Sequence, residues 1–144
     1  VNMERTNVRY LEADSLPEKV DVVTIDVAFI SLDKVLPAVK KIIADDGIVI
    51  ALIKPQFEAG KENVGKKGVV RDPQVHLTVI KSVIATAREL GFKIAGLDYS
   101  PVKGPEGNIE YLLYLKNAAD AEEIAVDPDE TVNKSHLTLD TSGK

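Results

Sequence analysis

Two aliphatic runs joined by an amphipathic segment constrain the fold more than any other feature of this sequence. The runs cover residues 20–27 and 48–53 and are almost continuously apolar, as expected for strands buried on both faces of a sheet. Between them, residues 32–44 place apolar side chains at helical spacing after Ser31, a residue type that caps helices. A strand, a helix and a second strand in this order predict parallel pairing through a right-handed crossover.

The second half of the sequence extends this sheet. Asp72 followed by Pro73 predicts the start of a helix, because a carboxylate cap and a proline at the first helical position favour one. Strands are expected over residues 92–99 and 109–115, and the link of about nine residues between them is too short for a parallel crossover. We therefore predict an α/β protein with a partial Rossmann-like methyltransferase fold, in which a mostly parallel sheet ends in an antiparallel hairpin.

Composition excludes several kinds of site. The chain has no cysteine, which rules out disulfides and thiolate chemistry, and its two histidines, His76 and His136, are too few and too far apart for a metal cluster. No stretch reaches the ~18 apolar residues of a membrane span, and no secretory leader opens the chain. The sequence therefore predicts a cytoplasmic protein without a metal centre.

The charge distribution divides the chain into two parts. Residues 1–117 carry sixteen basic and sixteen acidic side chains, whereas residues 118–144 carry two basic and seven acidic ones and so supply the whole net charge of −5. We expect residues 1–117 to form the folded domain and residues 118–144 to be an acidic, largely disordered tail. The sequence also opens abruptly at Val1, so we expect it to be part of a longer chain.

Three polar residues are expected to meet at one edge of the sheet. Asp26 and Lys54 each lie at the carboxyl end of a predicted buried strand, and Glu110 begins the last strand, which runs in the opposite direction. Open α/β sheets bind their ligands at this edge. A lysine amine can take the proton of an attacking hydroxyl when burial and positive neighbours lower its pKa, although flanking carboxylates raise it. Individually, such residues are more often helix caps, turn residues or solvated charges.

Four long strings resemble one family, the TlyA or hemolysin A family of FtsJ-like 2′-O-methyltransferases. They cover much of residues 1–117 and are ordered and spaced as in that family: TIDVAFIS at 24–31, ALIKPQFEAG at 51–60, VGKKGVVRDP at 64–73 and SPVKGPEGNIE at 100–110.

The resemblance implies a specific chemistry. It implies S-adenosylmethionine as cofactor and ribosomal RNA as substrate, with the methyl group going to a cytidine ribose. Asp26, Lys54 and Glu110 match the last three members of the family's Lys-Asp-Lys-Glu tetrad, with Lys54 as the base and Asp26 also at the cofactor. The family's first lysine, its glycine-rich cofactor loop and its RNA-binding domain would precede residue 1. We therefore expect the longer parent protein to be an rRNA methyltransferase and this chain alone to be inactive.

The polar segment after Lys54 is the expected RNA contact. Its cationic residues could grip phosphates from a glycine-hinged loop, although an ordinary solvated loop would have the same composition. Two other functions stay open, namely a non-catalytic RNA or protein interaction module and a hemolysin-like membrane-active protein. The RNA-facing residues that we predict are Lys61, Lys66, Lys67 and Arg71.

Overall fold

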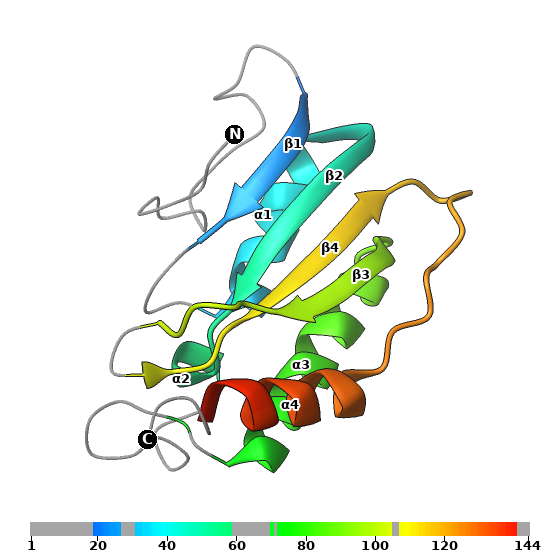
Figure 1. Ribbon diagram of the computed structural model, residues 1–144. Helices are drawn as coiled ribbons and strands as arrows, with labels where there is room; N and C mark the ends of the chain where they lie inside the picture. The colour runs from blue at the N-terminus through cyan, green and yellow to red at the C-terminus, as the bar shows by residue number, and fades with distance from the viewer. Residues whose placement is uncertain (1–18, 27–30, 59–69, 71, 105–106, 141–144) are drawn as a thin grey trace.

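The computed structural model describes residues 19–26, 31–58, 70, 72–104 and 107–140. Its centre is a four-stranded sheet in the order β1-β2-β4-β3 (Figure 1). β1 pairs with β2 in parallel, and β4 runs antiparallel to both of its neighbours, β2 and β3. The last strand is thus inserted between its two predecessors and forms an antiparallel hairpin with β3. The strands are β1 (Val20–Ile25), β2 (Ile43–Ile53), β3 (Lys93–Tyr99) and β4 (Tyr111–Asn117).

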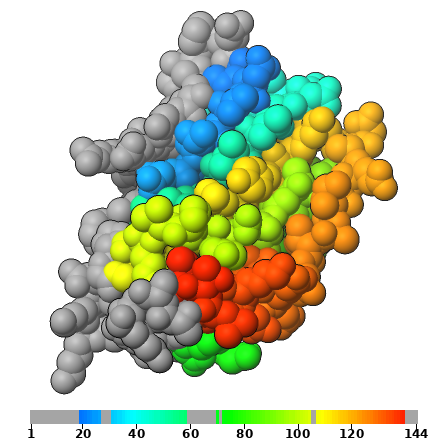
Figure 2. Space-filling model, viewed as in Figure 1, coloured from blue at the N-terminus to red at the C-terminus, as the bar shows by residue number. Residues whose placement is uncertain are grey.

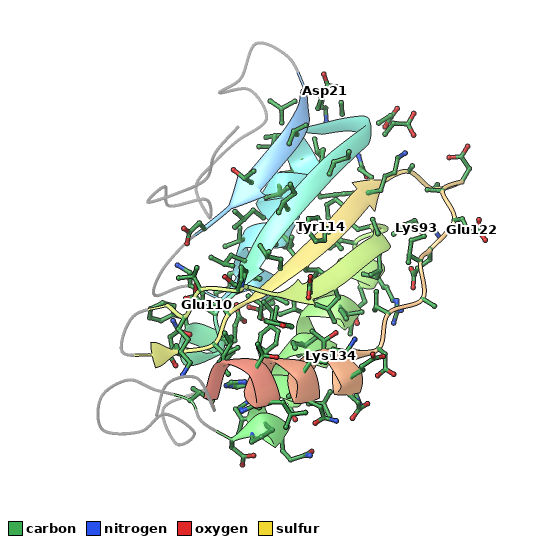
Figure 3. All side chains as sticks on the ribbon, viewed as in Figure 1. Asp21, Lys93, Glu110, Tyr114, Glu122 and Lys134 are labelled. Atoms are coloured by element: carbon green, nitrogen blue, oxygen red, sulfur yellow. The ribbon has the colours of Figure 1, made fainter. Side chains whose placement is uncertain are left out.

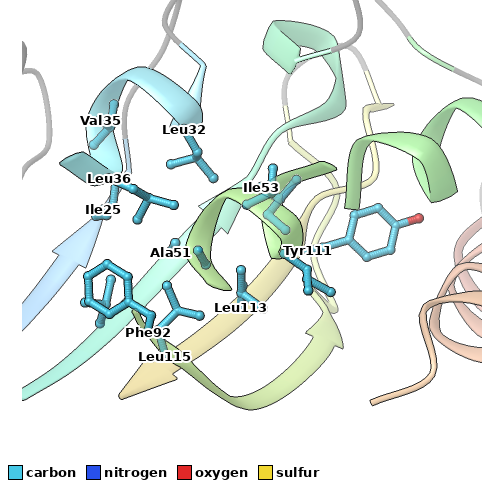
Figure 4. Packing of buried hydrophobic residues seen from close by; sticks show 14 of the residues in the cluster. Ile25, Leu32, Val35, Leu36, Ala51, Ile53, Phe92, Tyr111, Leu113 and Leu115 are labelled. Carbon is cyan, nitrogen blue, oxygen red and sulfur yellow. The ribbon is translucent and has the colours of Figure 1, made fainter. Parts of the chain in front are cut away.

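Two helices supply the crossovers. α1 (Leu32–Ile42) connects β1 to β2, and α3 (Pro73–Glu89) leads from β2 towards β3. The start of α3 is as predicted, because the Asp72 side chain accepts a hydrogen bond of 2.9 Å from the backbone N–H of Gln74. Both helices pack apolar side chains against the sheet, and Figure 4 shows this core at close range. Short helix α2 (Pro55–Glu58) begins directly after Lys54.

β2 begins five residues earlier than the predicted strand. Ile43 is buried and pairs with Val20, whereas the next pair in the register is Val22 with Ile48, so the strand contains a bulge. A Cβ at Gly47 would lie 2.5 Å from the Ile43 side chain, so this position accepts only glycine without rearrangement. Asp45, Asp46 and Gly47 thus lie in this bulge, inside the strand.

The C-terminal segment is ordered where we expected disorder. Residues 128–135 form α4 (Pro128–Ser135), and the short π-helix η5 (His136–Asp140) follows it. Helix α4 contacts α3 and β3, and Figure 2 shows this orange-red segment lying along the β3 strand. The structure thus has helix over residues 128–140, where we expected a largely disordered tail. Asp127 caps α4 by accepting a hydrogen bond from the backbone N–H of Glu130, and Val132 and Leu139 are buried in the same core as the sheet.

Candidate active site at the carboxyl edge of the sheet

The sheet topology brings the three predicted site residues to one edge. β1 ends just before Asp26, β2 ends just before Lys54, and β4 starts just after Glu110. Since β4 is antiparallel to β2, with Ile53 opposite Tyr111, the start of β4 lies beside the end of β2. Figure 3 places Glu110 at this end of β4, near α2. The expected meeting of the three residues is thus what the structure has, while their chemical roles stay a prediction.

Lys54 and Asp26 form an ion pair through Nζ and Oδ1. The Lys54 side chain is 15% exposed and the Asp26 side chain is 47% exposed. The lysine side chain therefore lies mostly inside the protein, whereas the aspartate side chain lies at the surface. A partly buried pair of this kind is screened less than a surface pair, so the carboxylate fixes the position of the amine. Asp26 keeps an open side on which a ligand could bind.

Glu110 lies next to this pair in a buried position. It is 7% exposed, and its Oε2 accepts a hydrogen bond of 3.3 Å from Gln56 Nε2 on α2. Burial raises the pKa of the Glu110 carboxyl, and the charge of Asp26 raises it further. The hydrogen bond from Gln56 and the charge of Lys54 act in the opposite direction. The pKa of Glu110 therefore depends on Gln56, Lys54 and Asp26.

A glycine backbone packs directly on the Glu110 carboxyl. A Cβ at Gly104 would lie 2.2 Å from Glu110 Oε2, so no larger residue fits without moving the carboxyl. Two backbone hydrogen bonds close the turn between β3 and β4 that contains Gly104. The N–H of Gly104 donates to the carbonyl of Asn108 at 2.7 Å, and the N–H of Ser100 donates to the carbonyl of Glu110 at 2.8 Å. Sequence reasoning missed this role of Gly104, for which the only signal was the glycine-rich string before Glu110.

Glu58 is a second carboxyl near this edge, half-buried, that sequence reasoning missed. It lies at the end of α2, and its Oε1 accepts a hydrogen bond of 2.7 Å from the backbone N–H of Leu32 at the start of α1. Burial raises its pKa to about 7, with the Leu32 bond lowering it and the charge of Asp33 raising it. Glu58 therefore ties the helix that follows Lys54 to the helix that follows β1.

The predicted RNA-facing residues Lys61, Lys66, Lys67 and Arg71 lie outside the described residues. Within the described ranges, no group of three or more histidine, aspartate or glutamate side chains is placed to hold a metal ion. Nor does any helix of these ranges have the length and apolar character to cross a membrane.

Comparisons with known proteins point to one family. The family model described as FtsJ-like methyltransferase matches residues 1–117. The chain is 44% identical over 144 residues to "Putative rRNA methyltransferase YqxC" of Bacillus subtilis, covering 96% of this chain and 51% of that protein. It is also 44% identical over 120 residues to "16S/23S rRNA (cytidine-2′-O)-methyltransferase TlyA" of Mycobacterium tuberculosis, covering 83% of this chain and 45% of the relative. The chain spans about half the length of these curated relatives.

Solved structures agree on the fold. "Putative hemolysin from Streptococcus thermophilus" superposes with a TM-score of 0.87 at 41% identity, over 96% of this chain and 51% of that one. A structure named as an S-adenosylmethionine-dependent methyltransferase from Listeria monocytogenes matches with a TM-score of 0.52 at 17% identity, over 76% of this chain and 66% of that one. The second likeness concerns the fold alone. Together with the sheet topology, these matches confirm the predicted Rossmann-like α/β fold.

Proposed function

The chain belongs to the FtsJ-like methyltransferase family, and from this premise we propose that it carries the catalytic edge of an S-adenosylmethionine-dependent enzyme that methylates a ribose 2′-hydroxyl of ribosomal RNA. The observation that carries the proposal is the mostly buried Lys54 amine, paired with Asp26 beside the carboxyl of Glu110. The name of the Mycobacterium tuberculosis relative supports cytidine as the modified nucleotide.

Lys54 is the proposed base. A ribose hydroxyl is a weak nucleophile at neutral pH, so its proton must leave as the oxygen attacks the methyl carbon. The cofactor would supply its methyl group as a sulfonium and leave as the neutral thioether, and the ribose oxygen would take the methyl group. The Lys54 amine, after releasing the proton that it holds in the ion pair with Asp26, would accept the proton of the hydroxyl. Asp26 then lies in contact with the new ammonium group, and the nearby carboxyl of Glu110 adds negative charge when it is ionised. The two acids thus stabilise the charge that the step creates.

The described residues fit part of an S-adenosylmethionine site. The cofactor supplies an electrophilic methyl group when bound. Asp26, with its half-exposed carboxylate at the edge, is the residue that we propose to hold the cationic part of the cofactor. In residues 19–26 and 31–58 the structure has no glycine-rich turn at a helix N-terminus, the feature that commonly binds the cofactor's anionic part.

The RNA contact is proposed for the segment after α2. Lys61, Lys66, Lys67 and Arg71 follow the proposed base closely in sequence, and cationic side chains of this kind hold nucleic-acid phosphates without reading the bases. Their contribution is therefore expected to be salt-dependent and independent of the nucleotide modified.

Methyl transfer to ribosomal subunits tests the proposal. A protein of the full length of the curated relatives that contains this chain, called the extended protein below, is compared with the 144-residue chain and with extended Lys54→Ala. We expect labelled methyl to pass from S-adenosylmethionine to unmethylated subunits only with the unsubstituted extended protein. Extended protein that binds subunits without transferring methyl would contradict the proposal and favour a non-catalytic RNA-binding function.

A further inference from the structure

Both backbone polar groups of Val70 are held by buried side chains. The N–H of Val70 donates to Asn108 Oδ1 at 3.0 Å, and its carbonyl accepts a hydrogen bond of 2.8 Å from His76 Nε2. Val70, Asn108 and His76 are each 1–2% exposed. Val70 follows Lys54 and α2 in the sequence and lies just before α3, and these two bonds hold its backbone in place.

Asn108 and a hydrogen-bond partner of His76, Tyr111, flank Glu110 in the sequence. Asn108 is two residues before it, and Tyr111 directly follows it as the first residue of β4. The Tyr111 hydroxyl lies 2.9 Å from His76 Nδ1, and the backbone of Tyr111 pairs with Ile53, the residue before Lys54. In Figure 4 the Tyr111 ring carries its hydroxyl away from the aliphatic cluster. The bonds therefore connect Val70 with the strand ends that carry the proposed base and Glu110.

The C-terminal helix completes this arrangement. Ser135 Oγ of α4 lies 2.8 Å from the Tyr111 hydroxyl and donates to Val132 O at 2.7 Å. His136 Nε2 lies 3.0 Å from His76 Nδ1. Ser135 is fully buried, so this contact lies inside the protein. The segment that we expected to be a disordered tail thus supports the residues next to Glu110.

Buried polar groups of this kind define geometry more than they add stability. An apolar core could fill the same volume, but it would not fix Val70 in one position, whereas a satisfied buried network specifies a single arrangement. Each of the bonds has a length typical of protein hydrogen bonds. Loss of one partner leaves a buried group without its bond, and the neighbouring backbone then shifts to recover it.

We propose that His76, Asn108 and Tyr111 form a positioning clasp. The clasp holds Val70, which lies just before α3, against the turn that carries Glu110, and α4 supports it through Ser135. This inference rests on the proposed methyl transfer. The clasp residues touch neither RNA nor cofactor in this account. They act by holding Tyr111 and the turn before Glu110 in one arrangement, and Tyr111 pairs with Ile53, the residue before Lys54.

Two substitutions at one position separate positioning from packing. His76→Gln keeps an N–H donor near the place of Nε2, whereas His76→Phe keeps the ring volume and removes the donor. Ile94→Val controls for lost stability, because it removes one buried methyl group from β3 at the end of the sheet away from Glu110. In the extended protein we expect His76→Phe to lower kcat by about tenfold or more with little change in KM for S-adenosylmethionine. His76→Gln is expected to restore most of kcat.

A second readout does not depend on activity. In the 144-residue chain, NMR gives the exchange rate of the Val70 amide and the titration midpoint of the Glu110 carboxyl. We expect His76→Phe to speed exchange at Val70 and to move the Glu110 midpoint down towards its ordinary value, because a loosened turn admits water and burial is the main cause of the raised pKa. The groups facing Glu110, namely Gln56, Lys54 and Asp26, are unchanged in this variant. Ile94→Val is expected to change neither value.

The two readouts distinguish failure of the clasp from failure of the proposed function. A Glu110 midpoint that stays constant in His76→Phe would overturn the positioning role, whether or not the protein transfers methyl groups. Equal kcat for His76→Phe and Ile94→Val at equal loss of Tm would overturn it as well. An inactive extended protein with a shifted Glu110 midpoint would leave the clasp standing and refute the methyl transfer alone.

Discussion

Replacing Gly104 by alanine is expected to displace the Glu110 carboxyl with little loss of stability. The added Cβ would lie 2.2 Å from Glu110 Oε2 and 2.6 Å from its Cδ. Ordinary contact begins at 3.4 Å, so the carboxyl has to move by about 1.2 Å. The clashing atoms are the far end of a side chain and not backbone, so the cost in folding free energy is expected near the lower limit for overpacking, about 1 kcal/mol.

The expected effect on catalysis is larger than the effect on folding. A misplacement of about 1 Å in an active site can cost about 10²-fold in rate, and the displaced carboxyl also loses its bond to Gln56. Gly104→Ala in the extended protein is therefore expected to lower kcat by about 10²-fold while Tm falls by only about 2–4 °C. Single-turnover methyl transfer measures the first quantity, and thermal unfolding by circular dichroism measures the second.

Gly107→Ala is the matched control from the same turn. Gly107 has a φ of +86°, and a Cβ there would meet nothing within 4 Å. Alanine at this position costs about 1–2 kcal/mol of backbone strain but makes no contact with Glu110. We expect it to lower Tm and to keep most of the activity. The reasoning would be refuted if Gly104→Ala kept its activity, or if the two variants lost activity in proportion to their loss of Tm.

Three further predictions concern the charged groups of the edge. The pKa of Glu58 is about 7 in the folded protein and 4.5 in the unfolded chain, so the folded state binds this proton more tightly. The stabilisation from this proton is fully present below pH 4.5 and is lost as pH rises through about 7. Because Glu58 is partly exposed, the free energy of unfolding is expected to fall by only about 2 kcal/mol between these two pH values. Urea unfolding at several pH values measures this, and Glu58→Gln, which keeps an acceptor for the backbone N–H, is expected to flatten the dependence. Gln56→Leu removes a bond that lowers the pKa of Glu110, so the acidic limb of the kcat profile is expected at higher pH, whereas an unchanged profile would disprove the coupling. Asp26→Asn removes the charge beside Lys54 and is expected to lower kcat by about 10²-fold or more in the same transfer assay, with a result near wild type counting against the role of the pair.

The sheet topology was predictable because it depends on local patterns. Apolar runs with a helical segment between them imply a parallel crossover, and the short link before Glu110 implies a hairpin. From these two inferences it followed that Asp26, Lys54 and Glu110 share an edge. The family resemblance then suggested a chemistry for the edge, and the match over residues 1–117 confirmed the family.

The features that were missed depend mostly on contacts between distant parts of the chain. Helix α4 is the exception in part, because Asp127 before Pro128 is a local start signal like Asp72 before Pro73, and Asp127 accepts a hydrogen bond from the backbone N–H of Glu130. Its packing through Val132 and Ser135 could not be read from the sequence. The hydrogen bond between Glu58 and Leu32 and the close approach of Gly104 to Glu110 are non-local. A charged residue in a polar loop and a glycine in a turn have the same local sequence whether or not they support a site.

The position of the transferred methyl group tests the central claim most directly. A 2′-O-methyl group prevents the ribose oxygen from attacking the adjacent phosphodiester, so the RNA chain resists alkaline cleavage at that nucleotide. Ribosomal RNA is treated with the extended protein and labelled S-adenosylmethionine, hydrolysed in alkali and separated. The account predicts that the label stays in alkali-resistant dinucleotides and that it disappears with Lys54→Ala. Label in mononucleotides, or label that persists with Lys54→Ala, would contradict the claim that this edge methylates a ribose hydroxyl with Lys54 as the base.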